Sequence, residues 1–99
     1  MRVVLTEAAL DDLFAIGRTI AQEAPGRAGT FVDELYERCL RLGDMPQAYP
    51  LLPGWEDKGV RRRVHGSYLI SCRIGLDTID ILHVLHGGRD DERILFPDE

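Results

Sequence analysis

The chain has 99 residues, of which 44% are hydrophobic and 29% are charged, a composition typical of one small globular domain. No apolar run approaches the roughly 20 residues of a membrane span, and the N-terminus lacks the basic and apolar regions of a secretory signal. The two cysteines, Cys39 and Cys72, have no metal-type spacing, so a reducing cytoplasm is the default compartment. We therefore expect one cytoplasmic domain over residues 1–99.

The net charge of −5 conceals an uneven distribution along the chain. Residues 1–57 have a net charge of −5, residues 58–89 of +4, and the last ten residues of −4. A basic segment between acidic ones indicates a local surface for an anion or an acidic partner, rather than a general nucleic-acid binder. Such asymmetry also arises in ordinary folds, so charge alone does not assign a function.

The N-terminal part predicts a short strand followed by a helix. Val3–Leu5 is a short apolar run, and Thr6 then offers an N-cap hydroxyl. Residues at helical spacing form the apolar face of this helix: Ala9, Leu13, Ile16 and Ile20. Asp11 and Asp12 fall on its outer side, and Pro25-Gly26 marks its end.

A second amphipathic helix is predicted at about residues 27–42. Its apolar positions again follow helical spacing: Ala28, Phe31, Leu35, Cys39 and Leu42. Since only a short break separates the two helices, they are expected to form an antiparallel hairpin. Residues 44–58 contain three prolines and read as an irregular loop, with Tyr49, Leu51, Leu52 and Trp55 holding it to the core.

From Gly59 the apolar residues recur at every second position, which predicts strands at 60–65, 68–74 and 78–86 joined by tight turns. In the first strand Val60 and Val64 share a face, while Arg61 and Arg63 point the other way. The last strand is apolar on both faces, with Ile79, Ile81 and Leu85 on one and Leu82 and Val84 on the other. It is therefore a central strand covered on both sides, or one whose second face awaits a partner.

The predicted order is β-α-α-β-β-β, an α+β fold with a helical hairpin packed on an antiparallel sheet. In this order the chain resembles ParE-type toxins of the RelE/ParE superfamily. The resemblance covers about residues 3–90 in three blocks: Leu5-Thr6-x-x-Ala9 with the apolar hairpin positions, Gly59-Val60-Arg61-Arg62 leading to Gly66-Ser67-Tyr68-Leu69-Ile70 and Arg73, and Val84-Leu85-His86-Gly87-Gly88-Arg89-Asp90. The chain departs from the family pattern at Arg63 and at Ser71-Cys72, where apolar and aromatic residues are common.

The resemblance implies one of two activities. RelE-like members are similar to messenger-RNA endonucleases of the ribosome, whereas ParE-like members are known as inhibitors of DNA gyrase that have no nuclease activity. RNA binding depends on phosphate neutralisation, but this chain has a pI near 5.1, a single lysine, Lys58, and no tyrosine in its tail. We therefore expect a gyrase inhibitor that is not an enzyme and has no cofactor. The alternatives are a RelE-like nuclease, or a decayed toxin that retains only antitoxin binding.

The family also implies a ParD-like antitoxin whose C-terminal segment folds along the hairpin and the sheet. Such segments are rich in acids, and arginine binds carboxylates with a pair of hydrogen bonds. The residues expected to contact the antitoxin are Arg61, Arg63, Arg73, Leu13, Ile20 and Phe31. Arg62, on the face of Val60, is expected either to pair with an acid at the sheet edge or to extend its charged end to water.

The C-terminal region is the expected target-contacting element, because it is implicated in gyrase inhibition in ParE-like toxins. The residues assigned to it are Arg89, Ile94, Leu95 and Phe96. Residues 91–99 are either a flexible acidic tail or a packed part of the domain. Within them, the apolar residues Ile94–Pro97 form a packed terminal strand, a disordered end or a target contact. His83 and His86 point to opposite faces of a strand, so no metal site is expected. Neither nucleic acid nor a membrane is an expected partner of the toxin alone.

Overall fold

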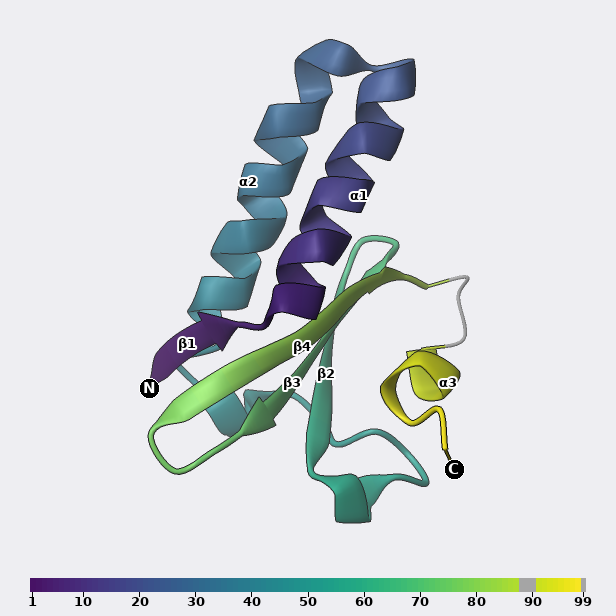
Figure 1. Ribbon diagram of the computed structural model, residues 1–99. Coiled ribbons are helices and arrows are strands. Elements are labelled where there is room, and N and C mark those ends of the chain that lie inside the picture. The colour runs from purple at the N-terminus through teal and green to yellow at the C-terminus, as the bar shows by residue number, and fades with distance from the viewer. Residues whose placement is uncertain (88–90, 99) are drawn as a thin grey trace.

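The structure is a computed structural model that describes residues 1–87 and 91–98. A helical hairpin lies against one face of a four-stranded sheet, and a short C-terminal helix lies against the other (Figure 1). The elements in chain order are β1 (Arg2–Leu5), α1 (Glu7–Glu23), α2 (Pro25–Arg41), two 3₁₀ turns (Pro46–Ala48 and Glu56–Lys58), β2 (Val60–His65), β3 (Tyr68–Ile74), β4 (Thr78–His86) and α3 (Asp91–Leu95). Within the described residues, no helix is long and apolar enough to cross a membrane.

The strands are ordered β1-β4-β3-β2. β2, β3 and β4 form the predicted antiparallel meander. β1 pairs with β4 in the parallel direction, with Val3 opposite Ile79 and Leu5 opposite Ile81. The sheet is therefore mixed: the predicted antiparallel strands are present, and β1 adds a parallel pairing that the sequence did not indicate. A tight turn fixes the direction of the strands that it joins, but β1 and β4 are far apart in sequence and have no such turn between them.

Thr6 fixes the start of α1 against the sheet. Its side-chain oxygen accepts a hydrogen bond from the Ala9 N–H (3.2 Å), which satisfies one of the unpaired donors of the first helical turn. The same hydroxyl donates to the Ile81 carbonyl (2.8 Å). One side chain therefore caps the helix and connects it to β4.

The hairpin turn is tighter than the sequence indicated. α1 ends at Glu23, and α2 begins at Pro25 instead of at about residue 27. Proline is favoured in the first turn of a helix, because the N–H that it lacks would have no partner there and its fixed φ suits the helix. Pro25 thus ends one helix and starts the next.

The main core lies between the hairpin and the sheet. Its buried members come from α1, from α2 and the residue that follows it, and from β3 and β4: Ala9, Leu13, Leu35, Cys39, Leu42, Ile70, Cys72, Ile79, Ile81 and Val84. A β-bulge shifts the register of β3 and β4, because Cys72 pairs with Ile81 but Ser71 pairs with His83. The bulge corrects the predicted faces of β4: Val84 joins Ile79 and Ile81 in the core, and Leu85 turns to the other face, opposite Leu69.

The second face of the sheet is covered by α3 and the loop before β2. Leu52, Val60 and Leu85 are buried but lie outside the main core. The Phe96 ring, just after α3, stacks on Trp55 with centroids 4.5 Å apart and an angle of 16° between the planes. The apolar Ile94–Pro97 segment is thus packed, as one interpretation held, but a helix rather than a strand holds its first residues in place.

Gly43 provides the first test of this packing. An added Cβ would collide with the Met1 carbonyl oxygen and lie 3.0 Å from a Val3 methyl group, so Gly43→Ala should lower the free energy of unfolding by about 1–3 kcal/mol. Gly29→Ala in α2 is the matched control, since no atom lies within 4 Å of its added Cβ. Urea unfolding should show no loss for this control, and a gain of up to about 1 kcal/mol. Equal effects of the two substitutions would contradict the close contact.

Candidate functional site

The arginines of β2 lie on two different faces of the sheet. Arg61 and Arg63 lie on the hairpin side, opposite Cys72 and Ile70 of the core in the strand register. The Arg61 guanidinium donates to the Tyr49 carbonyl (2.8 Å). The Arg63 guanidinium donates to the Arg38 carbonyl (3.3 Å) and lies 5.1 Å from the centre of the Tyr49 ring. Arg61 thus holds the loop at Tyr49, and Arg63 holds α2. Because carbonyl oxygens carry no net charge, these contacts do not neutralise the two guanidinium groups.

Arg62 points the other way and forms an ion pair with Asp91 of α3 (2.9 Å). The Asp91 side chain is only 8% exposed, so its ion pair with Arg62 offsets the cost of burying a carboxylate. Of the two expectations for Arg62, pairing with an acid is the one observed, although the acid comes from α3 and not from the sheet edge. The neighbouring Ser71 hydroxyl is buried opposite Arg62 and has no hydrogen-bond partner among the described residues.

The structure does not bring the three predicted antitoxin-binding arginines together. Arg73 is exposed and lies opposite Val60, on the second face of the sheet. Its Nε donates to the Lys58 carbonyl (3.2 Å). Arg73 is therefore separated by the thickness of the sheet from Arg61 and Arg63.

Asp12 is a structural residue that the sequence analysis placed on the outer side of α1. One of its carboxylate oxygens accepts hydrogen bonds from His83 Nδ1 (2.7 Å) and from the Val84 N–H (2.9 Å). These contacts join α1 to β4 just beyond Ile81, the last residue of β4 that pairs with β1. The β-bulge that presents both donors has no recognisable sequence pattern, so helical spacing alone could not reveal the contact.

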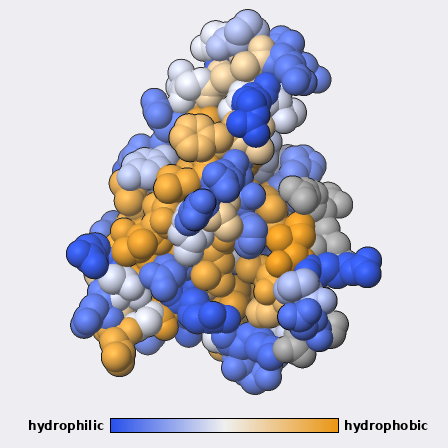
Figure 2. Space-filling model, in the orientation of Figure 1, coloured by the Kyte–Doolittle hydropathy of each residue, from blue (hydrophilic) through white to orange (hydrophobic). Residues whose placement is uncertain are grey.

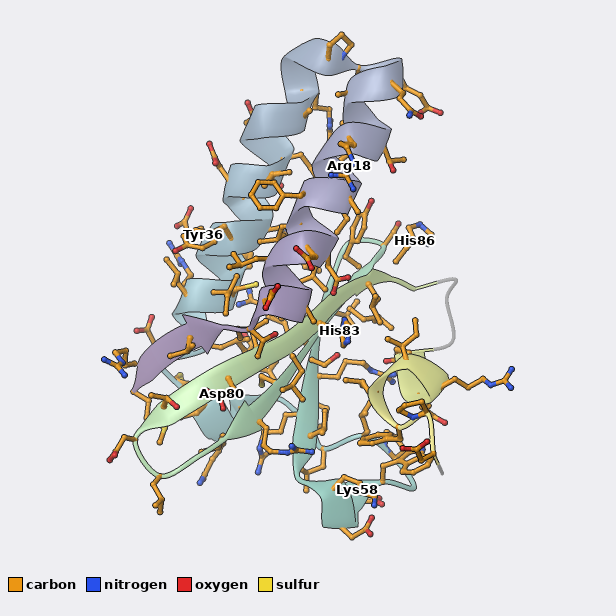
Figure 3. All side chains as sticks on the ribbon, viewed as in Figure 1. Arg18, Tyr36, Lys58, Asp80, His83 and His86 are labelled. Atoms are coloured by element: carbon orange, nitrogen blue, oxygen red, sulfur yellow. The ribbon has the colours of Figure 1, made fainter. Side chains whose placement is uncertain are left out.

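The two histidines of β4 have different surroundings. Figure 3 shows His83 beside the first turns of α1 and His86 at the far end of the strand. The His86 and Tyr68 rings meet edge to face, with their centroids 5.4 Å apart. The centroid of the Tyr68 ring in turn lies 5.5 Å from that of the Phe31 ring. Among the residues that the structure describes, no group of three or more His, Cys, Asp or Glu side chains is arranged to hold a metal ion.

Two open hollows border these contacts. One, of about 250 Å³, lies between α1 and the end of β4 and includes Asp12, Tyr68 and His86 in its walls. The other, of about 290 Å³, lies between the start of α1 and α3. Its walls combine Arg73 and His83 with the apolar side chains of residues 94–96. The predicted target-contacting residues Ile94, Leu95 and Phe96 therefore lie together and half-buried, while Arg89 falls outside the described residues.

The hairpin presents a different apolar surface from the one predicted. Leu13 is only 4% exposed and stabilises the core, whereas Ile20 and Phe31 are partly exposed. Figure 2 shows hydrophobic side chains over the base of the hairpin and across the lower half of the molecule, while the tip of the hairpin is largely hydrophilic. Large side chains that helical spacing places off the core form this surface: Leu10, Phe14, Tyr36 and Leu40. Phe14 is the most exposed of them, at 65%.

The two thiols are held in their neutral form. Burial raises the pKa of Cys39 to about 12, partly offset by the charge of Arg63. Burial likewise raises the pKa of Cys72 to about 11, and the charge of Arg61 partly offsets it. Since the thiolate is the nucleophile, thiols with raised pKa values are poorly reactive at neutral pH. Their burial and raised pKa values therefore identify both cysteines as core residues.

These features define a small α+β domain with an exposed apolar helical face and cations that help to hold its fold together. The sequence matches the family model described as the ParE toxin of the type II toxin–antitoxin system parDE, over residues 3–91. The chain therefore belongs to the ParE toxin family, and the resemblance found in the sequence is confirmed.

The fold is similar to a solved structure described as the chromosomal ParDE TA system from P. aeruginosa. The TM-score is 0.75 and the sequence identity 22%, with 87% of this chain and 95% of that chain covered. At a sequence identity of 22%, this structural similarity supports a shared fold. No significant match was found among curated proteins.

The contact between α3 and the sheet can be followed with Trp55, the single tryptophan of the chain. Arg62→Met leaves the buried Asp91 carboxylate without its ion partner, which should weaken α3 docking and separate Phe96 from Trp55. We expect a red shift of Trp55 emission at denaturant concentrations below the main unfolding transition. Arg41→Met, which removes an exposed pair with Glu37, is the control and should behave as wild type. Identical emission curves for all three proteins would show that the ion pair does not hold α3.

The burial of the two thiols can be tested through their chemical reactivity. A raised pKa in the folded state stabilises the fold below the ordinary thiol value of 9.0, and this contribution is lost as the pH rises toward 11–12. At pH 8, an aromatic disulfide reagent should therefore modify neither thiol in the native protein and both in denaturant. Rapid modification of the native protein would contradict the burial of Cys39 and Cys72.

Proposed function

We propose that this ParE-family chain is a toxin that inhibits DNA gyrase by binding it, and that a ParD-type antitoxin neutralises the toxin. The observation that carries the proposal is the family match over residues 3–91, to which the geometry adds a reason to favour binding over catalysis. A nuclease of the RelE type needs cationic groups gathered around one phosphate. Here Arg61 and Arg63 lie on one face and Arg62 on the other, where a carboxylate occupies it.

The net charge supports the same choice. A protein that binds RNA through its phosphates must offset their repulsion with Lys and Arg, but this chain has a net charge of −5 and one lysine. Acidic residues that are not buried also flank the apolar side chains of the C-terminal segment: Glu92 and Asp98. We infer that this segment meets a protein surface of gyrase rather than the DNA that gyrase holds.

The antitoxin surface that we propose begins on the exposed face of the hairpin. Contiguous apolar patches on a small soluble protein often mark protein interfaces. Leu10 and Phe14 on α1, with Tyr36 and Leu40 on α2, suit the apolar side of a partner helix. Ile20 and Phe31, which are partly exposed, remain candidates, whereas Leu13 is too deeply buried to contribute area.

For the target we propose the α3 segment, with Ile94, Leu95 and Phe96 as the contacts and Arg89 beside them in sequence. Two anchors support this choice. The Arg62–Asp91 pair and the Trp55–Phe96 stack hold the segment in one position on the sheet. A segment held in position loses less conformational freedom on binding than a free tail would.

The direct test is a gyrase supercoiling and cleavage assay on relaxed plasmid, with toxin freed of its antitoxin. We expect loss of supercoiling and accumulation of linear DNA, both reversed by adding ParD. Phe96→Ala should weaken the effect at least tenfold. Leu76→Ala should not, since it removes a side chain that is 98% exposed on the distant β3–β4 turn. A large excess of folded toxin without effect on gyrase would overturn the proposed target.

A further inference from the structure

The hollow between the start of α1 and α3 has walls that are held in place before any partner binds. It measures about 290 Å³ and lies beside β4. Figure 3 shows the labelled His83 between the two helices. On the α3 side, the Arg62–Asp91 pair and the stack of Phe96 on Trp55 fix the wall. Most of the lining is apolar: Ala8, Leu82, Ile94, Leu95 and Phe96. An occupant therefore does not have to order the site that it enters.

The charge beside the hollow is positive. Arg73 lies in the wall, and its Nε donates to the Lys58 carbonyl (3.2 Å). This bond uses one of the five guanidinium donors, and a neutral carbonyl leaves the charge in place. Asp80 lies opposite Arg73 in the strand register, outside the lining, and its carboxylate accepts a hydrogen bond from the Thr78 hydroxyl (3.0 Å). Among the described residues, no carboxylate lines the hollow, so an acidic group of a partner meets Arg73 there without repulsion from the wall.

His83 adds a polar group with a fixed orientation. Its Nδ1 donates to the Asp12 carboxylate (2.7 Å), which also accepts from the Val84 N–H (2.9 Å). Because an ionised carboxylate only accepts hydrogen bonds, the proton lies on Nδ1 and Nε2 is the ring nitrogen left for an occupant. The Thr6 hydroxyl, also in the wall, already donates to the Ile81 carbonyl. Arg73 thus supplies the charge of the site, and His83 supplies a further hydrogen-bonding group.

The volume of the hollow indicates the size of its occupant. Sites that enclose a whole small molecule span roughly 300–1,000 Å³, and this open hollow is at the lower end of that range. An apolar wall beside a single cation suits one large apolar side chain of a partner protein, with a carboxylate next to it. Side chains inserted into such pockets often dominate the binding energy of an interface.

We propose that this hollow receives an apolar side chain of gyrase, and that a gyrase carboxylate beside that side chain pairs with Arg73. The inference rests on the proposed function and specifies the chemistry of the target contact. It assigns Arg73 to the target surface, whereas the sequence predicted it in the antitoxin surface. The assignment agrees with the position of Arg73, which the sheet separates from Arg61 and Arg63.

A second copy of this chain is the weaker candidate for the occupant. Leu76 is 98% exposed on the β3–β4 turn, and Asp77 follows it in sequence, so a neighbouring copy offers the same pair of side chains. The turn and the hollow are different surfaces, however, and the contact would be heterologous. Heterologous contacts that do not close into a ring build open chains, which would remove the toxin from solution.

A ring placed inside the hollow separates the contact from the fold. Ala8→Phe adds this ring in the first turn of α1, where Ala8 lines the hollow. Ala15→Phe is the matched control, because it makes the same change on the same helix beside the other hollow, at the end of β4. Both variants should unfold at the wild-type temperature. We expect Ala8→Phe to weaken binding to purified gyrase at least tenfold in calorimetry, and Ala15→Phe to change it less than threefold.

Loss of the charge gives a second measurement in case Ala8→Phe does not fold. Arg73→Gln neutralises an exposed residue. It should weaken gyrase binding at least fivefold and change ParD binding less than threefold. Arg41→Gln, which removes an exposed charge paired with Glu37, is the control and should change neither.

The outcomes distinguish this inference from the proposed function. Equal gyrase binding by Ala8→Phe, Ala15→Phe and the wild type would overturn the inference and leave gyrase as the target. A loss with Ala15→Phe alone would place the contact at the other hollow and overturn it too. Weaker ParD binding with unchanged gyrase binding in Arg73→Gln would return Arg73 to the antitoxin surface. Self-association of the toxin that Leu76→Ala abolishes would identify a second copy as the occupant, against the inference. Absence of any gyrase binding by the wild type would overturn the inference and also the proposed target.

Discussion

The arrangement of this domain depends on β4, which is paired on both edges and covered on both faces. β1 and β3 supply its neighbours in the sheet. Thr6 bonds its Ile81 carbonyl, and Asp12 bonds its Val84 N–H and its His83 ring. These contacts fix the angle at which α1 leaves the sheet, and α2 follows because only Ala24 separates the two helices. Buried backbone groups must find partners, so polar contacts to a single strand determine where the apolar hairpin lies.

The same arrangement divides the charges of the basic segment. Alternation along β2 directs Arg61 and Arg63 toward the hairpin and Arg62 toward α3. What looks in the sequence like one cationic cluster is thus a set of separate contacts, two with carbonyls and one with a carboxylate. This division explains how an acidic protein can contain three consecutive arginines without forming a phosphate-binding patch.

The sequence predicted the elements of this fold well, because helical and strand spacings are local signals. The hairpin positions Ala9 and Leu35, the meander of β2–β4 and the covering of β4 on both faces all follow from apolar periodicity. The parallel pairing of β1, the bulge at Leu82 and the helix α3 do not, since each depends on contacts between residues far apart in sequence. The bulge also reassigned the faces of Val84 and Leu85, because period-two counting fails where one residue is inserted.

The candidate site was harder to predict than the fold. Pairing with an acid was one of two expectations for Arg62, whose side chain is 29% exposed, but the identity of Asp91 depends on the position of α3. Asp12 looked like a solvated helix residue because its partners, His83 and Val84, belong to a distant strand. Exposed Phe14 carried no signal of its own, since a single apolar residue off the core face is common in surface helices.

We propose that this ParE-family toxin acts by binding gyrase and not by cleaving RNA. Induction of the toxin in growing cells, followed by parallel sequencing of gyrase-linked DNA ends and of messenger-RNA 5′ ends, tests the claim most directly. We expect DNA breaks at gyrase sites within minutes of induction, while translated messages keep their normal 5′ ends. New 5′ ends within translated codons, together with an intact chromosome, would contradict it and assign the chain to the nuclease branch of its superfamily.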